Sequence, residues 1–405
     1  MKWLSIIAVA VISVSAAACG DPKPVEGSTW SRVDPSHDAR WRAYLKAFPV
    51  RDSWLTGPDQ LIPTGDGCFM GVGADSAPRG MLPAIWIATG DCSTSKLDRP
   101  DGTDALLRGN ISSLDSAVVA DDGTFLALGQ TAVGDPAAYG SFAVRGRPGA
   151  WWPPVARFQV ISNVRPFSPD VVGPDVLIAR PGGGFVAVGE SGPDLFAWSS
   201  GDGISWTRSP IPIPDGMKRV EIVSAATGSD GTIAVVGLKT IDPTVYQSQA
   251  LAWYSTDRGS TWHVATVPAD PGAWPMALVH DGKRFVAMGM VLHDGKPSDP
   301  WALTSVDGAT WQREPGLEPA GTRGFYAATV LSDGRIAAIS AGSASSSPPP
   351  EQVCGPTVLF LGGPSIIEER LGCNPVPSTI IQLKDGRLAA SMGEHLWLRE
   401  PVGRE

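Results

Sequence analysis

The sequence predicts an all-β fold, a seven-bladed β-propeller, on three observations. One short phrase occurs seven times: a glycine turn, then an apolar segment built around a small residue, and usually a closing glycine. A β-type repeat of about 50 residues is typical of a propeller, in which each repeat forms one four-stranded blade. The 47 glycines and 37 prolines among 405 residues suit many short strands separated by turns. The anchors that begin the apolar segments lie 48 to 60 residues apart and are Phe69, Phe125, Phe185, Ile233, Phe285, Ile336 and Leu388.

Blade five shows the expected order of strands within one repeat. Apolar runs at 274–280, 285–289 and 301–305 predict the inner, second and third strands, and 310–314 predicts the outer strand. The inner strands of the other repeats carry small and β-branched residues, which suits strands crowded around a central axis.

The last repeat is one strand short, because the chain ends soon after strands expected at 377–383, 387–393 and 395–399. The missing strand has a counterpart near the N-terminus, where residues 27–30 repeat residues 259–262 letter for letter. We therefore expect 28–33 to form the outer strand of blade seven, with Trp30 packed in the blade that holds Trp397.

The N-terminal 18 residues have the features of an export signal: Lys2, an apolar run over 3–14, and small residues directly before Cys19. This junction resembles a bacterial lipobox, although Ala16 stands where leucine is usual. The resemblance implies that Cys19 is lipidated, that 19–27 is a tether, and that the protein is held on a membrane, facing outside the cytoplasm. The alternative is ordinary cleavage after Ala18 and free secretion. No later apolar segment is long enough to span a bilayer.

A short helix is expected near 36–48, where Ser36 can cap the N-terminus and an apolar face follows. We interpret it as a cover over the seam between blades seven and one, with a functional lid as the alternative. The propeller, a single domain, then occupies 28–405.

The four remaining cysteines form an even set in an oxidising compartment. Cys354 and Cys373 lie 9 and 10 residues from Gly363, the centre of a turn at 362–364, so we expect them to lie opposite each other on a hairpin. Cys68 starts the second strand of blade one, and Cys92 follows the end of its third. We predict the disulfides Cys68–Cys92 and Cys354–Cys373. No zinc site is expected, because CxxC spacing is absent.

A second motif lies between the third and fourth strands of blades three, four and five. Its aspartate can accept backbone N–H groups across a turn, its glycine can adopt a positive φ, and its tryptophan can fill the base of the blade. The motif resembles the Asp-box, or bacterial neuraminidase repeat, of sialidase-like propellers. That resemblance implies a structural turn on the side away from the usual active site. The residues concerned are Asp202, Trp206, Asp257, Gly259, Trp262, Asp307 and Trp311.

The resemblance to sialidases also makes it possible to ask whether the sequence carries the catalytic residues of a sialidase. Sialidases bind the substrate carboxylate with three arginines and use a tyrosine nucleophile activated by a glutamate. Their first arginine belongs to an Arg-Ile-Pro motif on the first inner strand, and Leu61 takes its place here. The protein is therefore not expected to be a true sialidase, and no catalytic residue is assigned.

Four residues are the candidate ligand-binding set. Tyr326 is placed like a sialidase tyrosine, near the start of the sixth inner strand, with Arg323 before it. Glu221 starts the fourth inner strand, with Arg219 before it. Blades four and six face one another across the ring, so the two arginines are placed to bind one carboxylate together. The alternative is that they solvate loop ends or pair with acidic neighbours, Arg219 with Asp215 and Arg323 with Glu318.

The net charge of −9 gives no indication of nucleic-acid binding. The five histidines lack ligand spacing, and no catalytic, metal or cofactor motif is present. We expect a membrane-anchored lipoprotein whose propeller is a binding or scaffolding module for a glycan or a protein. The alternative is a carbohydrate-active enzyme, a glycoside hydrolase of sialidase-like architecture with a non-standard site.

Overall fold

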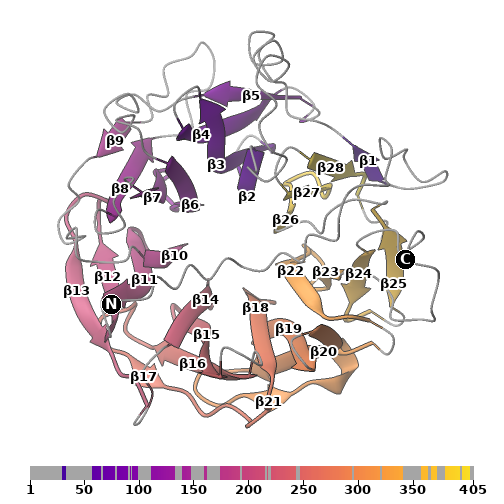
Figure 1. The fold of residues 1–405 in the computed structure, drawn as a ribbon. Helices are drawn as coiled ribbons and strands as arrows, with labels where there is room; N and C mark the ends of the chain where they lie inside the picture. The colour runs from indigo at the N-terminus through magenta and orange to yellow at the C-terminus, as the bar shows by residue number, and fades with distance from the viewer. Residues whose placement is uncertain are drawn as a thin grey trace.

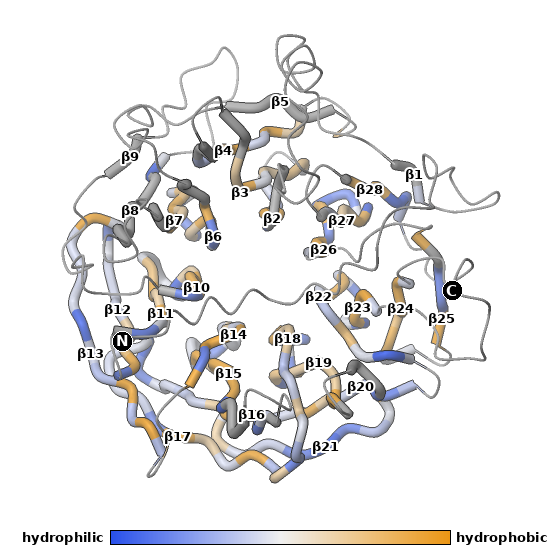
Figure 2. Tube along the Cα trace, in the orientation of Figure 1, coloured by the Kyte–Doolittle hydropathy of each residue, from blue (hydrophilic) through white to orange (hydrophobic). Residues whose placement is uncertain are grey.

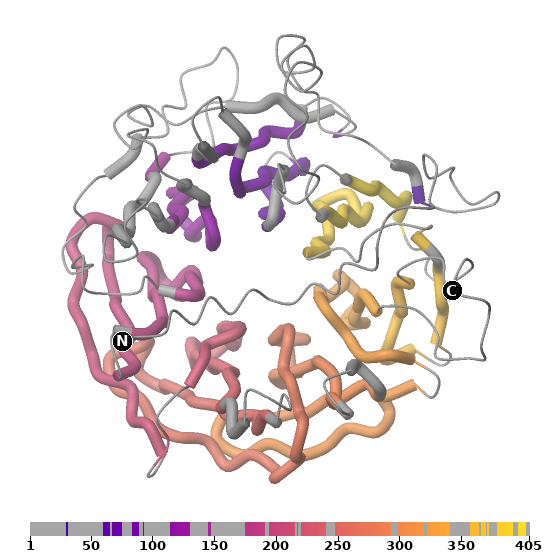
Figure 3. Tube along the Cα trace, viewed as in Figure 1, coloured from indigo at the N-terminus to yellow at the C-terminus, as the bar shows by residue number. Residues whose placement is uncertain are grey.

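The computed structural model shows a ring of seven four-stranded antiparallel blades around a central axis (Figure 1), which confirms the predicted fold class. The chain visits the blades in sequential order (Figure 3). The structure describes residues 30–32, 57–64, 67–77, 80–89, 92, 94–98, 111–132, 139–146, 159–161, 174–191, 194–214, 217, 220–242, 247–293, 296–319, 322–340, 357–363, 366–371, 379–392 and 395–401.

In each of the first six blades the chain runs from an inner strand near the axis to an outer strand at the periphery. Blade one consists of β2 (Gly57–Pro63), β3 (Phe69–Ala77), β4 (Gly80–Thr89) and β5 (Thr94–Asp98). Blade two consists of β6 (Ile111–Val119), β7 (Phe125–Ala132), β8 (Tyr139–Gly146) and β9 (Gln159–Ile161). Blade three consists of β10 (Pro174–Ala179), β11 (Phe185–Ser191), β12 (Asp194–Ser200) and β13 (Thr207–Ile211). Blade four consists of β14 (Val220–Thr227), β15 (Ile233–Asp242), β16 (Gln247–Ser255) and β17 (His263–Val264).

Blade five consists of β18 (Ala273–His280), β19 (Phe285–His293), β20 (Lys296–Ser305) and β21 (Gln312–Arg313), and the short 3-10 helix η2 (Pro315–Leu317) follows it. Blade six consists of β22 (Phe325–Val330), β23 (Ile336–Ser340), β24 (Thr357–Leu361) and β25 (Ile367–Arg370). Blade seven contains β26 (Thr379–Gln382), β27 (Leu388–Met392) and β28 (His395–Arg399), and β1 (Trp30–Arg32) pairs with β28.

Two pairings depart from the plain order of strands. β4 pairs in parallel with β6 through Met81 and Ile111, so blades one and two share one continuous sheet. β1 pairs antiparallel with β28, and Trp30 lies opposite Arg399. Trp30 and Trp397 belong to one hydrophobic cluster.

Seven hydrophobic clusters of described residues hold the ring together, one at each seam between neighbouring blades. At the seam between blades three and four, Val186 and Val188 pack against Ile222. The hydropathy colouring in Figure 2 shows apolar residues along second strands such as β15 and β19. Second strands are apolar on both faces because a blade covers each side.

The small residue within each apolar phrase faces a tryptophan in three of the blades. Trp198 lies opposite Ala187, Trp397 opposite Ala390 and Trp86 opposite Gly71 in the third-to-second strand register. These tryptophans are buried. A small side chain therefore leaves room for a large one on the adjacent strand.

The glycine that closes the phrase is explained by the path of the inner strand rather than by a tryptophan. In six blades the register of the inner strand shifts by one residue where it passes the end of the second strand. A Cβ on Gly237 would lie 2.3 Å from the carbonyl oxygen of Glu221, a distance that no side chain can adopt. The residues skipped by the register are Asp59, Asp115, Asp175, Val223, Met276 and Tyr326.

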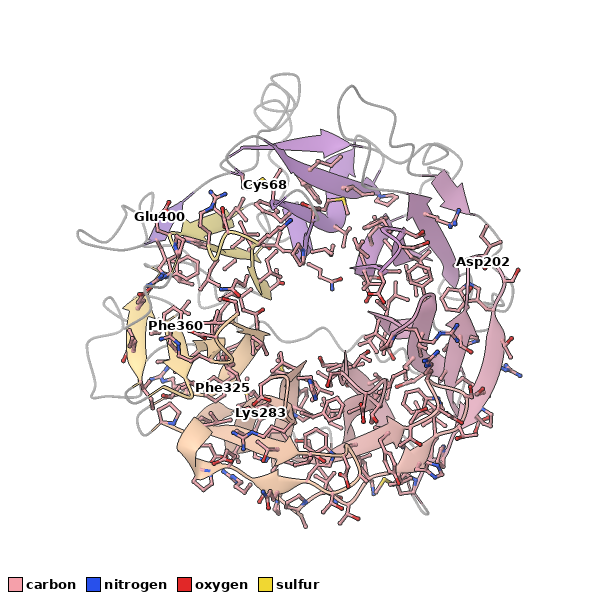
Figure 4. All side chains as sticks on the ribbon, turned by 180° about the vertical axis from the view of Figure 1, so that it is seen from behind. Cys68, Asp202, Lys283, Phe325, Phe360 and Glu400 are labelled. Atoms are coloured by element: carbon pink, nitrogen blue, oxygen red, sulfur yellow. A yellow bond between two sulfur atoms is a disulfide. The ribbon has the colours of Figure 1, made fainter. Side chains whose placement is uncertain are left out.

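The predicted disulfide Cys68–Cys92 is confirmed, with Cα atoms 5.3 Å apart. It lies in the hydrophobic cluster between blades one and seven, where Nη2 of Arg387 approaches Sγ of Cys92 to 3.1 Å. Figure 4 shows the sulfur atoms beside the label of Cys68. Cys354 and Cys373 lie outside the described residues.

Several other predictions also fall outside the described residues: the signal at 1–18, Cys19, the tether at 19–27 and the helix at 36–48. Within the described ranges, no helix is long and apolar enough to cross a membrane.

Candidate functional site

The inner strands all begin on one face of the ring, which we call the loop face, and the third-to-fourth strand turns lie on the opposite face. On that opposite face, the carboxylate of Asp202 accepts hydrogen bonds from its own turn. Its Oδ1 accepts the N–H groups of Ile204 and Ser205, each at 2.8 Å. The N–H groups of Ser205 and Ile204 are the main cause that lowers the pKa of Asp202. Figure 4 shows Asp202 at the periphery of the ring, away from the axis.

The corresponding turns of blades four and five have the same construction. Oδ1 of Asp257 accepts the N–H of Thr261 at 2.8 Å, and Oδ1 of Asp307 accepts that of Ala309 at 2.9 Å. Burial raises the pKa of both aspartates, but these hydrogen bonds outweigh it, so each pKa is lowered.

The tryptophan of each turn bonds to its glycine. Nε1 of Trp262 donates to the carbonyl of Gly259 at 3.0 Å, and Nε1 of Trp311 donates to that of Gly308 at 2.9 Å. In blade three, Nε1 of Trp206 lies 3.3 Å from the carbonyl of Gly203. Gly259 has a φ of 88°, which L-residues with side chains rarely adopt. These turns are local structural devices.

On the loop face, the structure brings two of the four candidate residues together. Tyr326 is the skipped residue of β22 and is partly buried. Burial raises its pKa, and the positive charge of the exposed Arg323 opposes that rise. Arg219 lies outside the described residues.

The alternative partner considered for Arg323 is engaged within blade five. Oε1 of Glu318 accepts hydrogen bonds from Nε of Arg313 at 2.6 Å and from the N–H of Ala302 at 2.8 Å. Glu318 therefore ties η2 to the outer strands of its own blade.

Glu221 lies close enough to another carboxyl group, that of Asp175, for their charges to interact. Its pKa is raised by burial, and its charge in turn raises the pKa of Asp175 in blade three. The pKa of Asp175 lies well above its usual value, first because of burial and then through repulsion from Glu190, Glu221 and Asp115. Oδ2 of Asp175 is shielded from solvent and has no hydrogen-bond partner among the described residues. We call Asp115, Asp175, Glu190 and Glu221 the acidic group.

The sequence reasoning missed Asp115, Asp175 and Glu190, although a signal for two of them was present. Asp59, Asp115 and Asp175 each stand ten residues before the anchor of their repeat. All three are the residues skipped by the register of their inner strands. Aspartate thus occupies one equivalent position at the loop face in three consecutive blades.

The position of the sialidase arginine is part of the core here. Leu61 is only 2% exposed and packs with Ile381 and Leu398 between blades one and seven. Within the described part of the chain, no three His, Cys, Asp or Glu side chains are arranged to hold a metal ion.

No protein-family model matches the sequence, and no curated protein matches it either. Among solved structures, YCF48 bound to D1 peptide is similar, with 10% identity, a TM-score of 0.51 and coverage of 94% of this chain and 98% of that one. The extracellular domain of a putative hybrid two-component system from B. thetaiotaomicron is similar over 93% of this chain and 40% of its own, with 8% identity and a TM-score of 0.52. Trypanosoma rangeli sialidase in complex with sialic acid has 11% identity, a TM-score of 0.48 and coverage of 94% of this chain and 59% of that one. Identities this low show the propeller fold alone.

Proposed function

We propose that this protein is a binding or scaffolding module whose loop face meets a glycan or a protein partner. The observation that carries the proposal is the convergence of the acidic group from blades two, three and four on that face. On the opposite face, the repeated carboxylates are bound within their own turns. We interpret these turns as Asp-boxes, which hold the frame and leave recognition to the loop face.

A rigid frame supports this function, because loops held in place lose less conformational entropy on binding. The seam clusters and the disulfide supply rigidity around the described ring. We propose that the pairing of β1 with β28 closes the ring by supplying the fourth strand of blade seven.

We also propose that the protein is exported and held on the outer side of a membrane by a lipid on Cys19. The support is the signal-like segment over 1–18 and the lipobox-like junction. With β1 beginning at Trp30, the tether spans at most roughly 35 Å. Replacement of Cys19 by alanine should move the protein from the membrane fraction to the soluble fraction. A wild-type chain that lacks a lipid adduct by mass spectrometry would refute the anchor.

The second candidate, a glycoside hydrolase of sialidase-like architecture, rests on the proximity of Tyr326 and Arg323 at the loop face. Two observations weigh against it. Leu61 is buried in a seam, and burial raises the pKa of Tyr326, which disfavours the reactive phenolate. No metal or cofactor is required by the proposed function.

A binding screen with glycans and peptidoglycan fragments tests the choice, run on the full chain beside a turnover assay with a fluorogenic sialoside. We expect binding without turnover, and weaker binding after Glu221→Gln. The matched control is Asp194→Asn, which changes an exposed carboxylate of blade three. Turnover that disappears on Tyr326→Phe would favour the hydrolase instead.

A further inference from the structure

We propose that Cys68–Cys92 is a reversible thiol–disulfide exchange site, in which Arg387 stabilises the thiolate that Cys92 becomes on reduction. The reaction partner of this site is a dithiol. The contact made by Arg387, the backbone of Cys92 and the place of the bond at a seam support the inference.

Arg387 directs a hydrogen-bond donor at one sulfur atom of the bond. Its Nη2 lies 3.1 Å from Sγ of Cys92. A sulfur atom in a disulfide is a weak, uncharged acceptor, whereas a thiolate carries a full negative charge and accepts a charge-assisted hydrogen bond. The guanidinium group therefore stabilises the reduced form of Cys92 more than it stabilises the disulfide.

Asp385 fixes the direction of this arginine. Oδ2 of Asp385 accepts a hydrogen bond from Nε of Arg387 at 2.6 Å, and Oδ1 accepts one from its backbone N–H at 3.0 Å. The Asp385 side chain is 46% exposed, whereas the Arg387 side chain is only 17% exposed. Because water screens the more exposed group, the carboxylate cancels only part of the positive charge that acts on the sulfur.

The same pair of residues occurs in blade six. There, Nε of Arg335 donates to Oδ2 of Asp333 at 2.8 Å, and its backbone N–H donates to Oδ1 at 3.0 Å. In blade seven the pair lies beside the disulfide of blade one, because the first turns of these two blades pack together: a Cβ on Gly67 would lie 3.8 Å from Cβ of Lys384. Arg335 is therefore a matched control for Arg387.

The backbone of Cys92 also favours the reduced form. Cys92 has a φ of 66°, in the left-handed region. A residue with a side chain rarely adopts this conformation, which costs free energy. In the disulfide, Cys92 is tied to Cys68 in this conformation, and reduction removes the tie.

The place of the bond makes exchange slow but reversible. Only 5% of Cys68 and 2% of Cys92 are exposed, within the hydrophobic cluster between blades one and seven. A dithiol therefore reaches the bond through local opening, which limits the rate and leaves the equilibrium unchanged. The cluster also contains Phe69, Leu383 and Leu396, whose apolar contacts do not depend on the bond. We therefore expect the ring to remain folded in the dithiol form.

Exchange takes two steps. One thiolate of the dithiol attacks Sγ of Cys68, and the electron pair of the broken S–S bond passes to Sγ of Cys92, beside Arg387. The second thiol of the reductant loses its proton to solvent and attacks its partner sulfur in the mixed disulfide. Cys68 then leaves as a thiolate and takes a proton from solvent. The two cysteines gain two electrons, and the dithiol becomes a disulfide.

The experiment equilibrates the full chain anaerobically, at neutral pH, with mixtures of reduced and oxidised dithiothreitol. After an acid quench and alkylation, peptide mapping gives the reduced fraction of Cys68–Cys92 separately from that of the other cysteines. For half reduction, Arg387→Gln should need a ratio of reduced to oxidised dithiothreitol about tenfold higher than the wild type, because the thiolate loses its charged donor. Arg387→Lys, which keeps the charge, should need a ratio between these two. The control Arg335→Gln should titrate like the wild type.

Equal ratios for the wild type and Arg387→Gln, or the same shift in Arg335→Gln, would overturn the inference. A bond that stays oxidised in every mixture would also overturn it, as would a wild type that loses its circular dichroism spectrum on reduction. The same spectra establish that each variant is folded.

Discussion

A Cβ on Gly289 would lie 2.1 Å from the carbonyl oxygen of Trp274, on the neighbouring inner strand. Pro275 lies opposite Gly289, and the register of β18 shifts directly after it. The same relationship joins Gly237 to Glu221 in blade four. In blades four and five, the glycine that closes the repeated phrase is therefore required by the backbone of the inner strand.

Gly289→Ala should destabilise the fold by at least about 2 kcal/mol, because neither backbone can withdraw without breaking the ladder. Gly201→Ala is the matched control, since a Cβ there meets nothing within 4 Å. Denaturant unfolding measures the difference. Equal denaturation midpoints for the two variants would show that the inner strand can move aside to make room for the added Cβ.

Replacement of both Cys68 and Cys92 by alanine should lower stability by about 3 kcal/mol, as expected for a disulfide that closes a loop of this length. The two residues are separated by 24 positions and lie at the seam between blades one and seven. Thermal unfolding without reductant is the measurement. A variant as stable as the wild type would contradict a structural role for the bond.

Asp202→Ala should cost about 1 kcal/mol at neutral pH, because the N–H groups of Ile204 and Ser205 lose the oxygen that accepts both of them on an exposed surface. The folded-state pKa of Asp202 is lowered, so its contribution is present above the unfolded value of 3.8. It is lost as the pH falls through the folded pKa. The difference in stability between the variant and the wild type should therefore become smaller in acid, as measured by thermal unfolding. A difference that does not change with pH would refute this account.

Asp175→Asn should have the opposite pH dependence. The pKa of Asp175 is raised in the folded protein, so above the unfolded value of 3.8 the folded state keeps a proton that the unfolded chain has lost. Stability then falls as the pH rises through that window. Asparagine does not titrate, so we expect the melting temperature of the variant to rise relative to that of the wild type as the pH increases above about 4. A parallel pair of pH profiles would disprove the raised pKa.

Arg399→Met should destabilise the seam between blades six and seven by about 2 kcal/mol, because Glu369 loses a charged partner. Nε of Arg399 donates to Oε2 of Glu369 at 2.7 Å, and Nε1 of Trp30 donates to the same oxygen at 2.8 Å. Adding Glu369→Gln should recover part of the loss, since no carboxylate then stays behind. Urea unfolding of the single and double variants tests this, and additive losses would count against the pairing.

The repeat phrase was sufficient to predict the seven blades, and strand ends were sufficient to predict Cys68–Cys92, because both depend on the order of residues along one chain. The skipped residues were harder to find, because a register shift is a relation between two strands. Glu221 was chosen for its place at the start of the fourth inner strand, yet in the structure its charge acts on Asp175 of the preceding blade. That interaction depends on how blades pack, which the order of residues within one repeat does not encode.

The pairing of β1 with β28 sets a limit on the order of assembly. Blades three to six are each built from one contiguous stretch, so each can form as soon as it leaves the ribosome. Blade seven cannot, because Trp30 emerges first and its partner Arg399 emerges near the end. Until then, the open edge of β27 or β28 is exposed to other chains. β1 therefore stays without its partner strand until the C-terminal part of the chain has been made.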